Sequence, residues 1–142
     1  MKIIWLLIAW IACTAPLARA DGDLKLSGAE TRNALHSIIT QQLDAFRAGN
    51  YTAAYKYADD ELKAVCSLQM FERMVQKGYP EIAHSVAANC GLTFDNGEDA
   101  VVSVRVRGAN DKWVDYQYLL HWRDAKWRIS GVVVSQEPVL EV

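Results

Sequence analysis

The spacing of apolar residues changes once along this chain, and that change most constrains the fold. Between Glu30 and Pro80 the apolar residues recur every three or four positions, which is the period of amphipathic helices. Between Val86 and Val134 they alternate with polar residues, which is the period of strands that have one covered face. Helices followed by hairpin-linked strands predict an α+β domain in which the helices pack on one face of an antiparallel sheet.

Three helices are expected in the first part of the chain. The first begins at Glu30 and stops at Gly49-Asn50, and a short second helix starts at Tyr51-Thr52. The third follows Ser67, a residue type that caps helix N-termini, and ends at Gly78-Tyr79-Pro80. The sequence therefore predicts three N-terminal helices.

Four strands are expected in the second part, separated by short segments that contain turn formers or are short enough for a hairpin. Their ranges are Val86 to Phe94, Ala100 to Arg107, Lys112 to Trp122 and Lys126 to Val134. If the last hairpin turns at Asp124-Ala125, then Trp122 faces Trp127 and Leu120 faces Ile129. The alternation predicts that these residues face the helices: Cys90, Leu92, Phe94, Val102, Val104, Val106, Val114, Tyr116, Tyr118, Leu120, Trp122, Trp127 and Ile129.

The N-terminus has the pattern of a secretory signal peptide over residues 1–20. Lys2 precedes an uncharged run from Ile3 to Ala12, which is too short to span a bilayer, and Ala18-Arg19-Ala20 supplies small residues for a signal peptidase. We expect cleavage after Ala20. The alternatives are an uncleaved anchor and a lipoprotein attached through Cys13. The pattern predicts a periplasmic or secreted protein with no stable membrane anchor once the signal is removed.

Cleavage would leave a single domain of acidic character. Residues 21–29 read as a flexible leader, 30–135 as the folded domain and 136–142 as a C-terminal tail. The signal contains Lys2 and Arg19 and no acid, so its loss reduces the 15 basic residues to 13 against 17 acidic ones and moves the net charge from −2 to −4. Such a balance argues against nucleic acid as a partner, because phosphate binding uses basic surfaces.

Two cysteines, Cys66 and Cys90, remain after the signal is removed. An even pair in an oxidising compartment favours a structural disulfide. Cys90 is expected to point toward the helices, where Cys66 would have to lie to bond it. Two buried thiols or a redox site are the other interpretations.

Several short strings, taken in order, resemble the family called domain of unknown function 4864. They are Gln41-Gln42-Leu43-Asp44-Ala45-Phe46-Arg47, Ala53-Ala54-Tyr55, Phe71 with Met74-Val75, Gly78-Tyr79-Pro80 and Trp127-Arg128-Ile129-Ser130-Gly131. The resemblance covers about Leu35 to Val134. It implies the cone of the nuclear transport factor 2-like, or cystatin-like, superfamily, in which a curved sheet wraps three helices and often leaves a pocket. It implies no particular activity.

The sequence offers little for catalysis or metal binding. The inward positions of the expected sheet contain no acid and no histidine, whereas enzymes on this scaffold place an ionisable group inside the cone. His36, His84 and His121 fit no metal-ligand spacing. Asp59-Asp60-Glu61 is better explained as a solvated helix end than as a cation site. We expect no metal and no cofactor.

Aromatic residues are the candidates for a ligand pocket. Their hydroxyls need partners when buried, so the interior could hold a small apolar or aromatic ligand, although plain core packing is the simpler interpretation. The candidate pocket residues are Phe46, Tyr55, Phe71, Tyr79, Tyr116, Tyr118 and Trp127.

The opposite face of the sheet is the candidate interface. It carries an exposed tryptophan beside leucine and arginine, which is the composition of a contact surface. The candidate interface residues are Arg105, Trp113, Gln117, Leu119 and His121. Related cones often dimerise through this face, so the resemblance implies a homodimer or another protein partner. The competing interpretation is that residues 136–142 fold over the face.

The sequence therefore predicts an exported, non-enzymatic module that binds a small ligand or another protein. The alternative is a small enzyme of isomerase or hydrolase type that uses the cone pocket.

Overall fold

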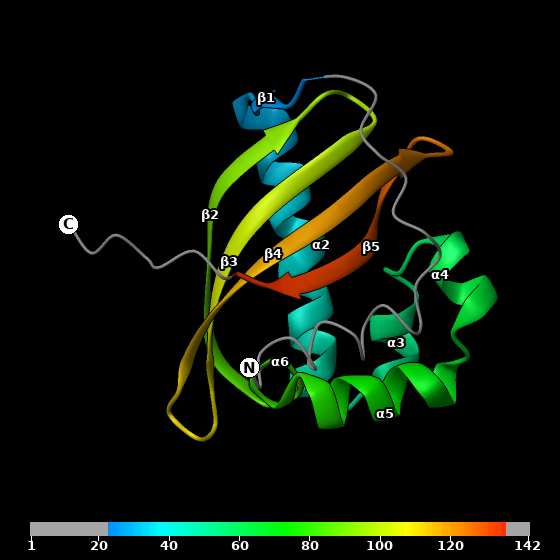
Figure 1. Ribbon diagram of the computed structural model, residues 1–142, viewed down its shortest axis with the longest axis vertical. Coiled ribbons are helices and arrows are strands. Elements are labelled where there is room, and N and C mark those ends of the chain that lie inside the picture. Colours follow the sequence, from blue (N-terminus) through cyan, green and yellow to red (C-terminus); the bar gives the residue numbers. More distant parts are fainter. Residues whose placement is uncertain (1–22, 136–142) are drawn as a thin grey trace.

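The computed structural model describes residues 23–135, which form a curved five-stranded sheet with helices on its concave side. In Figure 1 the long helix α2 (Ala29–Arg47) lies behind the sheet, and the shorter helices cover its lower right part. We call the side that faces these helices the inner face and the opposite side the outer face. The predicted α+β class is confirmed.

The helices follow the predicted order, with two short additions. Their bounds are α2 (Ala29–Arg47), α3 (Tyr51–Tyr55), α4 (Asp60–Val65), α5 (Leu68–Gly78) and α6 (Pro80–Ala83). Asn50 caps α3 by accepting from the backbone N–H of Ala53, and Ser67 caps α5 by accepting from that of Met70. Pro80 opens α6, where a missing N–H leaves no helical hydrogen bond unmade.

The strands form one antiparallel meander. Their bounds are β1 (Lys25–Leu26), β2 (Ser85–Asp95), β3 (Asp99–Gly108), β4 (Trp113–Arg123) and β5 (Lys126–Val134), and they lie in the order β1-β2-β3-β4-β5. Leu120 pairs with Ile129 and Trp122 with Trp127, as the sequence predicted. Trp122 is nevertheless 44% exposed, because it lies next to the end of β4.

The segment expected as a flexible leader contributes structure of its own. Lys25 pairs with Asp95 and Leu26 with Phe94, which adds the fifth strand β1 to the sheet. The helix α2 then begins at Ala29. The residues that were expected as the signal peptide and the C-terminal tail lie outside the described part of the chain.

A bulge in β2 changes which of its residues face the helices. Pairing with β3 shifts between Cys90 and Thr93, so that Thr93 is buried on the inner face while Leu92 is 64% exposed. Phe94 pairs with Val101, whose neighbours on β3 are buried inward, and it therefore lies on the outer face. The prediction that Leu92 and Phe94 join the core is wrong, because one extra residue reverses the alternation.

The predicted disulfide between Cys66 and Cys90 is also wrong. Cys90 is a free thiol on β2, beside α2. Cys66 ends α4, which packs against β5. Two strands, β3 and β4, separate β2 from β5, a distance of roughly 14 Å at the usual strand spacing. A disulfide needs Cα atoms within about 7 Å of each other.

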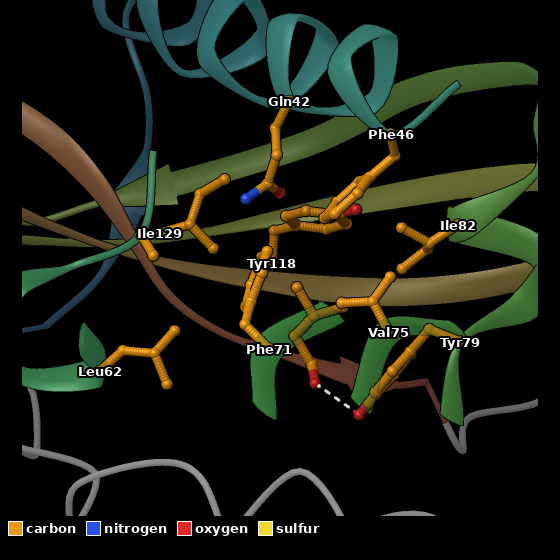
Figure 2. A pocket seen from close by; sticks show the side chains of 11 residues that line it. Gln42, Phe46, Leu62, Phe71, Val75, Tyr79, Ile82, Tyr118 and Ile129 are labelled. Atoms are coloured by element: carbon orange, nitrogen blue, oxygen red, sulfur yellow. Dashed lines mark hydrogen bonds between the residues drawn. The ribbon is translucent and has the colours of Figure 1, made fainter. Parts of the chain in front are cut away.

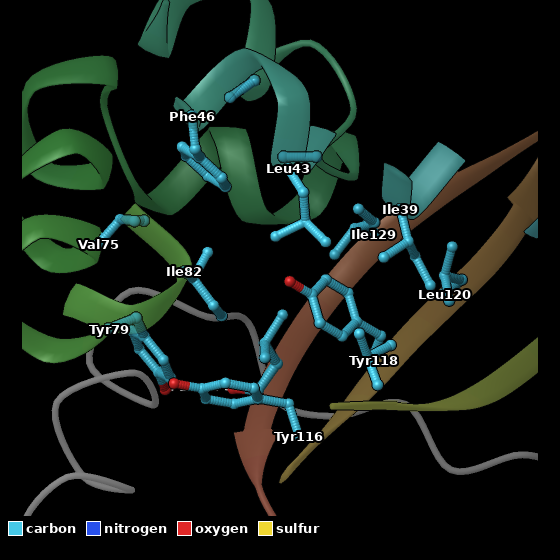
Figure 3. Packing of buried hydrophobic residues seen from close by; sticks show 14 of the residues in the cluster. Ile39, Leu43, Phe46, Val75, Tyr79, Ile82, Tyr116, Tyr118, Leu120 and Ile129 are labelled. Atoms are coloured by element: carbon cyan, nitrogen blue, oxygen red, sulfur yellow. Dashed lines mark hydrogen bonds between the residues drawn. The ribbon is translucent and has the colours of Figure 1, made fainter. Parts of the chain in front are cut away.

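The core lies between α2 and the inner face of the sheet. Figure 3 shows Leu43 and Phe46 of α2 opposite Tyr118 and Ile129 of the sheet. Within residues 23–135, no helix is long and apolar enough to cross a membrane.

Candidate functional site

A small enclosed cavity lies between α2, the shorter helices and the sheet. It has about 10 Å³ of room for solvent, close to what one water molecule needs. Its lining consists of Gln42, Phe46, Ala58, Leu62, Phe71, Val75, Tyr79, Ile82, Tyr118, Ile129 and Val132. Within the described chain, none of these lining residues is charged, so the cavity is apolar apart from an amide and two hydroxyls (Figure 2).

The structure brings four of the seven predicted pocket residues to this cavity. Phe46, Phe71, Tyr79 and Tyr118 line it. The other three serve the surrounding packing. Each of them packs against another aromatic ring. The distances between ring centroids are 5.3 Å for Tyr55 and Phe71, 6.0 Å for Tyr116 and Tyr79, and 5.4 Å for Trp127 and Trp122.

Gln42 is the polar lining residue that the sequence-based list of pocket residues missed. It occupies a buried position of α2 between Ile39 and Phe46, which are both core residues, and its amide nitrogen donates to the Ala54 carbonyl at 3.1 Å. The signal was present in the sequence, since an amide stands in the apolar stripe of the first helix. Figure 2 shows its side chain pointing from α2 toward Tyr118.

Tyr118 is the most unusual polar group of the cavity. Its side chain is fully buried, and its hydroxyl has no hydrogen-bond partner in the described structure. Burial raises the pKa of this phenol well above its usual value, so the hydroxyl keeps its proton. The hydroxyl of Tyr79, by contrast, donates to the Val132 carbonyl at 3.2 Å.

A second depression is an open groove between α2 and β2, with a volume of about 490 Å³. Its ionisable groups are already engaged. His36 shares a hydrogen bond with Thr93 at 2.7 Å, and Arg47 contacts Asp44 at 3.1 Å and donates to the Ser85 carbonyl at 2.8 Å. Burial and the nearby Arg32 lower the pKa of His36, which favours its neutral form.

Cys90 lies in the same groove. Burial raises the pKa of its thiol, and a hydrogen bond with Thr40 partly opposes this effect. A raised pKa makes the thiol a poor nucleophile. The groove therefore lacks an activated cysteine.

The outer face carries an apolar band that crosses all five strands. Cross-strand pairing aligns Leu26 with Phe94, Phe94 with Val101, Val101 with Leu119, and Leu119 with Gly131. We call the following residues the outer band: Leu26, Leu92, Phe94, Val101, Leu119 and Val133. Leu26 and Leu92 are 67% and 64% exposed. Figure 1 is viewed from this side of the sheet.

Charged rows flank the outer band on both sides. On one side His121 forms a hydrogen bond with Asp99, and it pairs across the strands with Arg128. On the other side the Arg105 guanidinium contacts the Asp115 carboxylate at 2.8 Å. All five predicted interface residues lie on this face, with Trp113 beyond the Arg105 row and Gln117 and Leu119 between the two rows.

The acidic cluster and the histidines form no metal site. Asp59 is buried, Asp60 is exposed, and Glu61 pairs with Arg123 at 3.0 Å. Over residues 23–135, no three histidine, cysteine or acidic residues are grouped so that they could hold a metal ion.

Comparison with solved structures places this fold among known proteins. A domain of unknown function with a cystatin-like fold from Nostoc punctiforme aligns with a TM-score of 0.57 and 13% identity, over 81% of this chain and 82% of that one. An NTF2-like protein from Campylobacter jejuni aligns with a TM-score of 0.50 and 16% identity, over 66% of this chain and 95% of that one. The chain thus has the nuclear transport factor 2-like fold.

Sequence comparisons give a family and no activity. The chain has no significant match among the curated proteins. One family model matches residues 29–142, which is most of the sequence. The chain belongs to the family described as domain of unknown function (DUF4864).

Proposed function

We propose that this domain is a non-enzymatic interaction module that pairs with a second copy of itself through the outer face of the sheet. The observation that carries the proposal is the outer band, which continues across all five strands between two charged rows. Exposed apolar surface with a polar rim is typical of protein interfaces.

The arrangement of charges favours a second copy as the partner. The row of Asp99 and His121 and the row of Arg105 and Asp115 lie three residues to either side of the pair of Val102 and Tyr118, and the pair of Val101 and Leu119 of the outer band lies between them. A two-fold axis that crosses the strands at the level of the pair of Val102 and Tyr118 would place each row over the other row of the partner. Asp99 of one copy would then face Arg105 of the other, which is a self-complementary contact.

Two antiparallel sheets can also pack through their faces. Antiparallel sheets pack face to face at about 10 Å, with side chains that interdigitate between them. The outer band offers branched side chains for such packing, whereas an enzyme of isomerase or hydrolase type would need an acid or a histidine in the cavity. Among the described residues, the cavity lining supplies neither.

The test is the oligomeric state of the purified protein and of one face variant. Sedimentation equilibrium should show a dimer at micromolar concentration. Leu119→Lys should weaken dimerisation by at least about tenfold, because it buries a charge in the band. Met70→Lys introduces the same charge at a 45% exposed position on α5 and should leave dimerisation unchanged. A protein that stays monomeric at high concentration would contradict the proposal.

Exchange of the charges at Asp99 and Arg105 tests the proposed two-fold axis. Asp99→Arg and Arg105→Asp should each weaken the dimer. Both changes in one chain should restore it, because opposite charges again face each other across the axis. If the double variant is weaker than both single variants, the two copies pack in another orientation.

We also propose that the domain acts outside the cytoplasm, and the pattern of residues 1–20 supports this location. Mass spectrometry of the protein from the periplasm or the medium should find Asp21 at the N-terminus. Ala18→Arg should block cleavage, because signal peptidases need small residues at that position. Full-length protein with Met1 in the cytoplasmic fraction would contradict this proposal.

A further inference from the structure

The lining of the cavity between α2 and the sheet includes a fully buried hydroxyl that lacks a partner among the described residues. Tyr118 projects from β4 into the cavity, and its buried hydroxyl forms no hydrogen bond with any described residue. The other polar side chains of the lining are engaged, since Gln42 donates to Ala54 and Tyr79 donates to Val132. A buried hydroxyl without a partner is destabilising, so native proteins rarely keep one unless something binds it.

The surroundings of this hydroxyl restrict what could bind it. The described lining carries no charge, so an ionic ligand would lose its hydration without compensation. Because burial raises the pKa of Tyr118, its hydroxyl stays protonated and can donate a hydrogen bond. The remaining lining is aliphatic and aromatic, which suits an apolar ligand body.

Part of the wall opposite the sheet, the helix α5, can move without breaking backbone pairing to the strands. Leu62 of α4 and Phe71 and Val75 of α5 form this wall (Figure 2). The helix α5 packs mainly against α3 and α6. Displacement of α5 would widen the cavity while all four long strands keep their hydrogen bonds, including those of Ile129 with Tyr57 and Asp59.

We propose that this cavity is a binding site for a small neutral molecule with an apolar body and one hydrogen-bond acceptor, which the Tyr118 hydroxyl holds. The cavity is nearly closed in the present state, with about 10 Å³ of room. Entry therefore requires outward movement of α5. The site is separate from the outer face, and its failure would leave the proposed self-association untouched.

Two isosteric probes test the role of the hydroxyl. Cyclohexanone and methylenecyclohexane differ in a carbonyl oxygen against a methylene group, so only the first can accept from Tyr118. In NMR titrations of the full chain we expect cyclohexanone to bind about fivefold more tightly, which corresponds to one neutral hydrogen bond. In Tyr118→Phe this preference should be lost or reversed, because the carbonyl oxygen would then be buried without a donor.

Tyr79→Phe is the matched control. It also removes a hydroxyl from the lining, but one that already donates to Val132. The preference for cyclohexanone should survive in this variant. If Tyr118→Phe keeps the preference for cyclohexanone, or if Tyr79→Phe abolishes it, Tyr118 is not the residue that donates a hydrogen bond to the ligand.

A cavity-enlarging variant keeps the test decisive if the wild-type protein binds weakly. Leu62→Ala should bind both probes more tightly and retain their ratio, because Leu62 lines the cavity and its truncation adds volume there. Val75→Ala serves the same purpose if Leu62→Ala does not fold. If neither the wild-type protein nor a folded enlarged variant binds cyclohexanone at millimolar concentration, the cavity is a filled core and the proposal is overturned.

Discussion

Gly108, the last residue of β3, occupies a position with no room for a side chain. A Cβ atom there would lie 2.8 Å from the Asn110 side-chain oxygen and 3.0 Å from the Glu81 Cα, which belongs to the backbone of α6. We therefore expect Gly108→Ala to lower the free energy of unfolding by about 1–3 kcal/mol through overpacking. Urea denaturation measures the change.

For Gly78→Ala we expect the opposite change in the free energy of unfolding. Apart from its chain neighbours and the backbone of its own helix, no heavy atom lies within 4 Å of a Cβ at Gly78, which is the last residue of α5. The variant should raise the free energy of unfolding by about 0.4–1 kcal/mol, because alanine reduces the freedom of the unfolded chain. A loss of stability in both variants would show that packing at Gly108 is not the cause.

The thiol of Cys90 gives a second prediction about a single residue. Because burial raises its pKa, its alkylation by iodoacetamide should be slow at neutral pH and should still accelerate above the usual cysteine range. Thr40→Val removes the hydrogen bond that favours the thiolate and should shift the rate profile to higher pH. A profile that levels off at the pH of an unperturbed cysteine would contradict this expectation.

Sequence alone could place Tyr118 on the inner face, since strict alternation along the third expected strand fixes which residues face inward. It could not reveal that the hydroxyl lacks a partner. That property depends on where Gln42 and Tyr79 direct their own polar groups, and these partners come from segments distant in the chain.

Among the elements, β2 departs most from its sequence pattern, and a matched pair of leucines can test the bulge. Leu92 is 64% exposed, whereas Leu120 on β4 is 1% exposed. Leu92→Ala should therefore change the free energy of unfolding by less than about 0.5 kcal/mol. Leu120→Ala should lower it by about 2–5 kcal/mol. Similar losses in both variants would mean that β2 keeps an unbroken alternation.

The long elements were predictable because their periods persist over many residues. The register of the hairpin of β4 and β5 could be predicted from the position of its turn, which places Trp122 opposite Trp127. Shorter helices and strands contain too few residues to show a period of apolar positions. β1 has two residues and α6 has four, and both depend on contacts with distant segments, such as the pairing of Leu26 with Phe94. The bulge in β2 could not be predicted, because the apolar residues of this strand also fit a regular alternation without a bulge.

For the whole molecule, the buried tyrosines predict instability at alkaline pH. Burial raises the pKa of Tyr79, Tyr116 and Tyr118 above the usual 10.0. The folded protein therefore keeps protons that the unfolded chain releases above this pH. The unfolded state binds fewer protons there, so the free energy of unfolding should fall as pH rises through and beyond 10.

Urea denaturation over the range from about pH 8 to 11 measures this effect, with tyrosinate absorbance as a second signal. Tyr116→Phe should reduce the slope of stability against pH, because it removes one of the three contributing groups. A stability that is constant across this range would contradict the prediction.

A single extra residue in β2 also bears on how such a domain can acquire a partner. Alternation along a strand divides its side chains between those that hold the fold together and those that meet other molecules. The bulge moves Leu92 and Phe94 from the first group to the second without altering either side chain. An insertion or deletion of one residue in such a strand changes which side chains face the helices and which face outward, so a comparison of relatives should consider strand length as well as residue identity.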